Sequence, residues 1–166
     1  MSATMTTKTH ISNQLDTRVL ARILEEGYGP GAWHGADLKA AIADVSPDLA
    51  FWRPSPERHN IAEIALHHAY FVRDVRSRLT GQDPGPFVMD GEEWFPLPAA
   101  SRLGWPAVLQ AVDDEQRRLY DAVTALSPDS RGVRTQAERF ELVLGITCHA
   151  VYHAGQVQLI KKLRGV

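Results

Sequence analysis

The stretch CHAVYHAGQ, residues 148–156, decides the fold because it places two histidines four residues apart within an apolar helical pattern. Each residue of a helix advances about 100°, so His149 and His153 lie on one face, within reach of each other. This periodicity predicts a helix over about residues 135–163, with both imidazoles in the middle of its buried side. The same face carries further residues at helical spacing: Leu142, Gly145, Ile146, Gln156, Val157, Ile160 and Leu163.

Three stretches upstream also show apolar periodicity, and no segment reads as a convincing strand. The first is in two pieces, residues 11–25 and 36–45, because GYGPG at 27–31 interrupts it. The other two are expected at residues 60–79 and 105–126. Together with the last helix, they predict an all-α, antiparallel four-helix bundle whose first helix is interrupted.

The segments around the second long helix have distinct signals. Asn60 and Glu63 form a capping-box pair at its start, and the helix should stop at Gly81. Residues 46–59 contain three prolines, which predicts an irregular connector. Residues 83–104 form a long irregular segment, rich in aromatic residues, between the second and third long helices. Loops of that length usually have a function or move, so we expect more than a passive connection.

Composition argues against several classes of function. The 166 residues suit one domain, residues 1–166, with residues 1–9 expected to be disordered. A net charge of -2 offers no basic excess for nucleic acid, and no apolar run approaches the roughly 20 residues that cross a bilayer. The N-terminus lacks the apolar core of a signal peptide, and the single cysteine excludes an internal disulfide. We therefore expect a cytoplasmic protein without nucleic-acid or membrane partners.

Two histidines on a buried face need an explanation, because neutral imidazoles require partners and two buried cations would be costly. One divalent metal ion resolves this by taking one nitrogen from each neutral ring. Two ligands make a weak site, so a third is expected from another helix. The candidates are His67 and His68 in NIAEIALHHAYF, residues 60–71. The apolar stripe centres closer to His68, yet a bundle helix has two neighbours, so either histidine could face the centre.

The alternative to a metal site is structural. A histidine pair at this spacing also occurs on helix surfaces, or in cores where backbone carbonyls accept its hydrogen bonds. His10, His34 and His59 lie in terminal or loop contexts, which predicts that they are solvated. Cys148 is rotated about 100° from His149, which favours a small packed thiol over a ligand or a nucleophile.

Both histidine motifs resemble those of a known family. NIAEIALHHAYF is similar to the second-helix motif of the DinB/YfiT-like metalloenzymes, and HAVYHAGQ, residues 149–156, is similar to their last-helix motif, HxxxHxGQ. AWHG at 32–35, VRSRLTG at 75–81 and the tryptophan-proline loop around Trp94 also resemble the family. The resemblance covers nearly the whole chain, and the order and spacing of the motifs are more specific than any one of them.

This resemblance implies a bundle that binds Ni²⁺ or Zn²⁺, with Fe or Mn as alternatives, through three histidines and often as a homodimer. The family's second-helix ligand lies four residues after a glutamate, which corresponds to His67 after Glu63, with His68 in reserve. The family's last-helix pair corresponds to His149 and His153. Several members are transferases or isomerases that use bacillithiol, mycothiol or glutathione, so a small-molecule substrate is implied.

Three histidine ligands leave at least one coordination position open, as in catalytic sites. That position suits water, whose pKa falls to about 7 on zinc, or a thiol, which loses its proton on coordination. No sequence feature separates thiolate from hydroxide as the nucleophile, and it is the resemblance to the family that implies a metal-dependent transferase using a low-molecular-weight thiol. The alternatives are a metal-dependent hydrolase that acts through activated water and a non-catalytic, structural bundle.

Other side chains have two interpretations each. Gln156, a catalytic candidate, is expected either to hydrogen-bond a ligand or substrate or to hydrogen-bond a neighbouring helix. Glu63 orients His67 or only caps its helix. An arginine near the mouth of the site is expected either to bind the carboxylates of a thiol or to be merely solvated. The candidates are Arg53, Arg73 and Arg102. Aromatic side chains line a pocket or belong to the core: Trp33, Tyr70, Trp94 and Phe95.

Overall fold

The structure is a computed structural model that describes residues 16–99, 101–127 and 134–166. Within these ranges the chain forms helices and no strand, which confirms the all-α prediction. The helices are α1 (Thr17–Gly27), α2 (Leu38–Ala43), α3 (Pro47–Ala50), α4 (Ile61–Thr80), α5 (Trp105–Thr124) and α6 (Gln136–Arg164).

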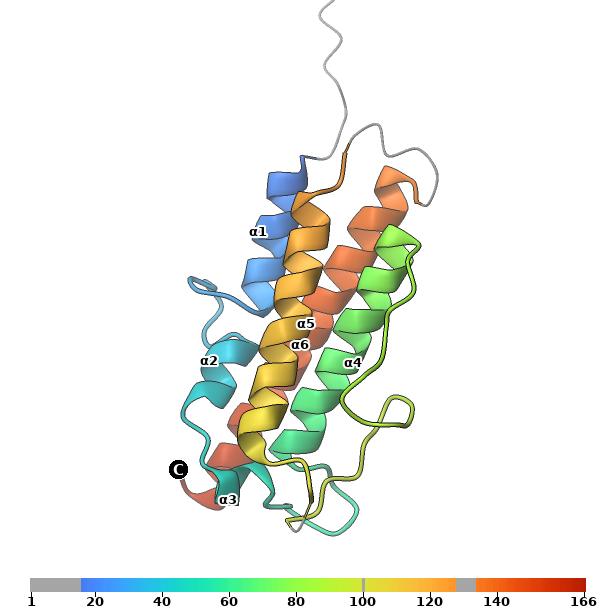
Figure 1. Cartoon of the computed structure of the whole chain (residues 1–166). Helices are drawn as coiled ribbons and strands as arrows, with labels where there is room; N and C mark the ends of the chain where they lie inside the picture. Colours follow the sequence, from blue (N-terminus) through green and yellow to red (C-terminus); the bar gives the residue numbers. More distant parts are fainter. Residues whose placement is uncertain (1–15, 100, 128–133) are drawn as a thin grey trace, which may run out of the picture.

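Four of these helices, α1, α4, α5 and α6, lie side by side as a bundle (Figure 1). The first is short, and the chain continues through α2 and α3 at the lower end, so the predicted interruption is present (Figure 1). The long loop after α4 returns along the bundle before α5 begins, so α4 and α5 run in the same direction (Figure 1). α1 and α6 run in the opposite direction, and the two pairs are therefore antiparallel to each other.

Several element boundaries differ from the prediction. Residues 1–9 and the predicted start of the first helix at residue 11 lie outside the described residues, and α1 ends at Gly27. The expectation of an irregular connector over residues 46–59 is wrong for residues 47–50, which form α3. Ser46 caps this short helix by accepting a hydrogen bond from the backbone N–H of Leu49 (3.3 Å), and proline is tolerated at a first helical position.

The predicted capping signals of α4 are confirmed. The Asn60 side chain accepts a hydrogen bond from the Glu63 backbone N–H (2.8 Å), and the Glu63 carboxylate accepts one from the Asn60 N–H (3.4 Å). At the other end Gly81 has a φ of 70°, a left-handed conformation that glycine adopts without a Cβ clash. These two ends fix the register of the helix and hence the direction in which His67 and His68 point.

The buried apolar side chains form two clusters, one in each half of the bundle. In the first, residues 61–69 of α4 pack with residues 150–160 of α6, the start of α5 and α2. In the second, residues 72–79 of α4 pack with residues 143–146 of α6 and with α1. The clusters change over beside residues 67 and 68 on α4 and residue 149 on α6, so these histidines lie at the middle of the bundle.

The long loop between α4 and α5 is fixed to α4 by hydrogen bonds. The Asn60 amide donates to the Leu97 carbonyl (2.7 Å), and the Leu97 N–H donates to the Glu63 carboxylate (2.7 Å). Nearer the loop's start, Arg76 donates to the Pro84 carbonyl (2.9 Å), and Arg73 donates to the Gly85 carbonyl. These bonds hold the middle of the loop, residues 92–95, against the face of α4 that carries His67.

No helix in the described part of the chain is both long enough and apolar enough to cross a membrane.

Candidate metal centre

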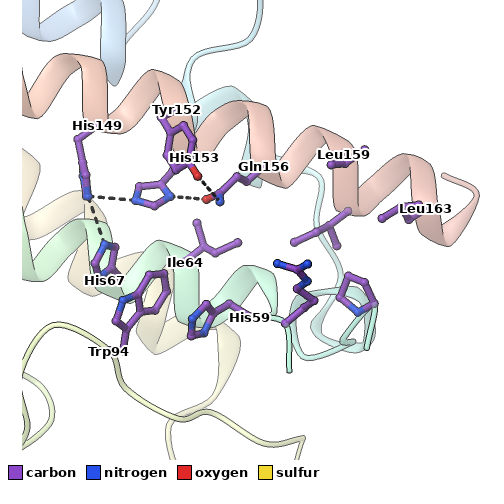
Figure 2. A pocket seen from close by; sticks show the side chains of 13 residues that line it. His59, Ile64, His67, Trp94, His149, Tyr152, His153, Gln156, Leu159 and Leu163 are labelled. Atoms are coloured by element: carbon purple, nitrogen blue, oxygen red, sulfur yellow. Dashed lines mark hydrogen bonds between the residues drawn. The ribbon is translucent and has the colours of Figure 1, made fainter. Parts of the chain in front are cut away.

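Three histidine side chains from two helices converge beside a cavity (Figure 2). His67 comes from α4, and His149 and His153 come from successive turns of α6. The Nε2 atom of His149 lies 3.3 Å from that of His67 and 3.0 Å from that of His153. One ligand nitrogen from each ring lies within 4.8 Å of the others. The structure thus brings together the three residues that the sequence motifs predict as ligands.

This spacing suits a shared cation. Zinc binds histidine nitrogens at about 2.0 to 2.1 Å, so tetrahedral ligands lie about 3.3 Å apart, close to the separations observed between the Nε2 atoms. Two Nε2 atoms at such a distance can be joined only by one proton or by a cation, since one proton at most can lie between them. The three histidines could therefore hold a divalent metal ion.

The opposite nitrogens of two rings are bonded to groups that can only accept hydrogen bonds. His67 Nδ1 lies 2.8 Å from the Glu93 carbonyl oxygen, and His153 Nδ1 lies 2.6 Å from the Gln156 Oε1 atom. The Gln156 amide nitrogen donates to the Tyr152 hydroxyl (3.1 Å), and the amide oxygen faces His153. Both Nδ1 atoms must therefore carry the proton, and the Nε2 lone pairs are left free for a metal ion.

Burial keeps the histidines uncharged. Burial lowers the pKa of His149 to about 3, with further contributions from the neighbouring His153 and His67. Burial also lowers the pKa of His153 to about 4, although its hydrogen bond to Gln156 opposes the shift. The pKa of His67 is lowered for the same reason, against the effect of the Glu93 carbonyl. Neutral imidazole is the form that binds metal, so the folded chain holds these rings ready for a cation at neutral pH.

The carbonyl that orients His67 lies in a strained turn. Glu93 has a φ of 56°, a left-handed conformation that is uncommon for a residue with a side chain. The Trp94 N–H closes the turn by donating to the Glu92 carbonyl (2.6 Å). Such strain costs roughly 1 to 3 kcal/mol, and it occurs here at the residue that fixes a candidate ligand. The turn also stacks the Trp94 ring on His67, with ring centroids 3.8 Å apart and planes 9° apart.

A cavity of about 660 Å³ opens beside the three histidines (Figure 2). Trp94 forms one wall, stacked on both His67 and His59. One polar wall carries Arg58, and none of the described residues that line the cavity is acidic. The remaining wall is largely apolar and comes from α4 and the last turns of α6: Ile64, Leu159, Ile160 and Leu163.

The other predicted candidates have different outcomes. Gln156 bonds His153 and Tyr152 on its own helix, so it orients a candidate ligand, and it makes no bond to another helix among the described residues. Glu63 does not bond His67; its carboxylate binds Arg53 and His59 as well as Leu97. His68 stands behind His149, with an Nδ1 to Nδ1 distance of 3.2 Å, and is not one of the converging residues.

Two expectations from the sequence are wrong. Cys148 is exposed, because a rotation of about 100° from His149 carries it beyond the buried face of α6. Trp33 is 87% exposed and therefore neither lines the cavity nor belongs to the core. Of the other aromatic candidates, Phe95 is a core residue, Tyr70 packs against the core and Trp94 lines the cavity.

The polar candidates outside the centre also differ from expectation. His34 is an exposed residue, but its ring is not merely solvated, because His34 Nε2 lies 2.8 Å from the Glu26 carbonyl oxygen; His10 lies outside the described residues. His59 was expected to be merely solvated, but it stacks on Trp94 and lies 3.1 Å from Glu63. Of the predicted arginines, Arg53 pairs with Glu63 and Arg73 bonds the loop, while Arg102 is exposed. None of these three lines the cavity, and Arg58 does so instead.

The fold and the site together define a class of protein, namely a helical bundle with converging histidines on α4 and α6. The family model described as the DinB superfamily matches residues 32–157, which include all three histidines. The chain belongs to the DinB superfamily. No curated protein and no solved structure matches it significantly.

Proposed function

We propose that this protein is a divalent-metal-dependent transferase that uses a low-molecular-weight thiol as co-substrate. The observation that carries the proposal is the convergence of three Nε2 atoms, 3.0 and 3.3 Å apart along the cluster, at the wall of a cavity. A divalent ion held by His67, His149 and His153 would keep a coordination position open and would deprotonate a thiol that occupied it. Zn²⁺ and Ni²⁺ are the first ions to test.

The charges of the cavity favour an anionic co-substrate. No acidic side chain is present among its described lining residues, so a thiolate or a carboxylate meets no like charge there. The guanidinium of Arg58 has no hydrogen bond or ion pair within the described part of the chain and is available for the carboxylates of a thiol. We assign Arg58 to binding the co-substrate, at the polar side of the cavity.

The apolar wall defines the second substrate. Ile64 lies beside the histidines, and Leu159 and Leu163 extend the hydrocarbon surface toward the end of α6, which suits the apolar body of an electrophile (Figure 2). In the reaction, the thiol sulfur forms a bond to an electrophilic carbon, and the bond from that carbon to its leaving group breaks. The leaving group takes the bonding electron pair, and the thiol proton passes to water.

Hydrolysis through activated water has less support at the same site. Such a reaction benefits from a general base within hydrogen-bond reach of the water, most often a histidine or a carboxylate. None of the described lining residues is a carboxylate, and His59, the lining histidine outside the converging three, is stacked on Trp94 with its Nδ1 atom beside Glu63. This difference makes the thiol transferase the function that the geometry supports best.

A direct experiment loads the purified chain with Zn²⁺ or Ni²⁺ and supplies bacillithiol, mycothiol or glutathione with a panel of carbon electrophiles. Mass spectrometry should detect the thioether at a rate that depends on the ion and is lost in His149→Ala. His34→Ala is the matched control, because His34 is exposed and lies outside the cluster. Loaded protein that forms no thioether above the background of free metal with any of the three thiols would contradict the proposal.

A further inference from the structure

Behind the three converging histidines lies a fourth, His68, which the proposed centre does not use. It is 1% exposed, and its Nδ1 atom lies 3.2 Å from the Nδ1 atom of His149. The two rings are nearly parallel, with planes 24° apart and centroids 5.5 Å apart. On its other side, His68 stacks with Tyr28, whose hydroxyl donates to Asp113 on α5 (2.7 Å). His68 is therefore held in one place on the side of His149 that faces away from the cavity.

The outer nitrogen of His68 meets a complementary group on α5. His68 Nε2 and Gln116 Oε1 are both buried atoms without a hydrogen-bond partner among the described residues. The Gln116 side chain lies close enough to His68 to oppose the lowering of the His68 pKa that burial causes, so each of these atoms is a candidate partner for the other. An amide oxygen can only accept, whereas an imidazole nitrogen can donate, so the two atoms satisfy each other if His68 carries its proton on Nε2.

We infer that His68 and Gln116 are positioning residues that hold His149 in the tautomer required of a metal ligand, a role that rests on the metal site proposed above. If Gln116 Oε1 accepts, neutral His68 is protonated on Nε2 and has a free lone pair on Nδ1. That lone pair accepts the proton on His149 Nδ1, because only one proton fits between two facing nitrogens. Neutral His149 then has its lone pair on Nε2, the atom that faces His67 and His153. Each proton position thus fixes the next, from α5 through α4 to α6.

The opposite arrangement is unfavourable at both ends of this relay. With the Gln116 amide in its observed orientation, a proton on His68 Nδ1 would leave two buried acceptors, His68 Nε2 and Gln116 Oε1, without a donor. It would also force the proton of His149 onto Nε2, where it would obstruct the cation. His67 and His153 receive the same orientation from single acceptors, Glu93 and Gln156, so all three rings are fixed from behind.

The tautomers can be measured in the wild-type chain without any metal. Long-range ¹H–¹⁵N correlation spectra of the chelator-treated protein at neutral pH should show His68 protonated on Nε2 and His149 protonated on Nδ1. The same pattern should persist in the Zn²⁺-loaded chain. His68 protonated on Nδ1 in the metal-free protein would overturn the inference, whatever the protein's activity proves to be.

Variants test whether the relay acts on the centre. His68→Leu should lower the affinity for Zn²⁺ by about 10- to 100-fold in calorimetric titration, as is typical when the hydrogen-bonded neighbour of a ligand is removed. His68→Asn places an amide oxygen near the position of Nδ1 and should recover a large part of this loss. Gln116→Leu removes the acceptor, so His68 should show both tautomers in the NMR spectrum and the affinity should fall.

The control is Val72→Ala, which truncates a fully buried side chain one turn further along α4 without touching a hydrogen bond. It should lower stability and leave the Zn²⁺ affinity unchanged. Equal affinity losses in Val72→Ala and His68→Leu, or none in His68→Leu, would reduce His68 to a packing residue and overturn the inference. If wild type bound metal but transferred no thiol, the proposed function would fail while these affinities still decided the role of His68.

Discussion

At the scale of single residues, the centre depends on the hydrogen-bond partner of the Nδ1 atom of each imidazole. A backbone carbonyl supports His67, an amide supports His153 and a second histidine supports His149. The sequence motif includes Gln156 and both members of the His67–His68 pair, so these supports were partly visible in it. The Glu93 carbonyl was not, because a backbone acceptor leaves no signature in the identity of its residue.

The first prediction concerns the ligands themselves. His67→Ala, His149→Ala and His153→Ala should each weaken Zn²⁺ binding by more than about 100-fold, since losing even a ligand's hydrogen-bonded neighbour costs about 10- to 100-fold. Calorimetric titration measures the affinity, and circular dichroism checks that the chain stays helical. His34→Ala, which alters an exposed histidine, should bind as wild type does. Wild-type affinity in any of the three cluster variants would remove that residue from the centre.

A second prediction follows from the lowered pKa values of the cluster. In the folded, metal-free chain the pKa of His149 is about 3 and that of His153 about 4, whereas an exposed histidine has a value near 6.5. Above about pH 7 both states are neutral and the free energy of unfolding is independent of these groups. Between pH 6.5 and 4 the unfolded chain takes up protons that the folded chain does not, so stability falls by up to about 1.4 kcal/mol per pH unit for each histidine.

Urea denaturation of the chelator-treated protein between pH 7.5 and 4.5 measures this dependence. The double variant His149→Gln/His153→Gln should show a shallower decline, because two of the responsible groups are gone. A free energy of unfolding that falls equally in the double variant and in wild type would show that these histidines are not buried in neutral form.

At the scale of elements, the start of α4 joins two loops to the helix that carries His67. The buried Glu63 carboxylate accepts hydrogen bonds from Arg53 (3.0 Å) in the first loop and from the Leu97 N–H (2.7 Å) in the second, and it lies 3.1 Å from His59. Burial alone would raise the pKa of Glu63, but the bonds from Leu97, Arg53 and His59 hold it below its usual value. The sequence predicted the capping role of Glu63, but its loop partners could not be predicted, because Arg53 and His59 lie in an irregular segment without periodicity and Leu97 is distant in the chain.

The third prediction is that Glu63→Gln lowers the free energy of unfolding by about 3 kcal/mol, since it leaves a partly buried guanidinium without its partner. Urea denaturation at pH 7 measures this loss. Glu57→Gln is the control, because Glu57 is exposed and bonds only the nearby Ser55 among the described residues. Equal effects of the two substitutions would show that the buried carboxylate does not hold the loops.

At the scale of the whole molecule, the helical periodicity and capping signals were sufficient to predict the bundle and its interrupted first helix. The direction of α5 was less accessible, because periodicity contains no information about where a connecting segment leads. The length of residues 83–104 was the relevant clue: these residues return along α4 and place Trp94 over His67. The cavity could not be predicted either, since its walls come from loops, from the first half of α4 and from the second half of α6.

A fourth prediction concerns global stability. An ion bound by α4 and α6 links two helices that are far apart in sequence, so it stabilises the folded state in proportion to its affinity. At about 100 times the dissociation constant the gain is about 2.7 kcal/mol, which corresponds to a rise in Tm of roughly 5 to 10 °C for a chain of this size. Calorimetry with Zn²⁺ and with chelator should show this rise in wild type and not in His149→Ala. An equal rise in both would place the ion elsewhere.

The most direct test of the metal centre is anomalous diffraction from crystals of the Zn²⁺-loaded chain, recorded on both sides of the zinc absorption edge. We predict one strong peak per chain, bound by the Nε2 atoms of His67, His149 and His153 at about 2.0 to 2.1 Å, with no fourth protein ligand. A peak at any other position, or fully loaded protein whose three rings do not share the ion, would contradict the account.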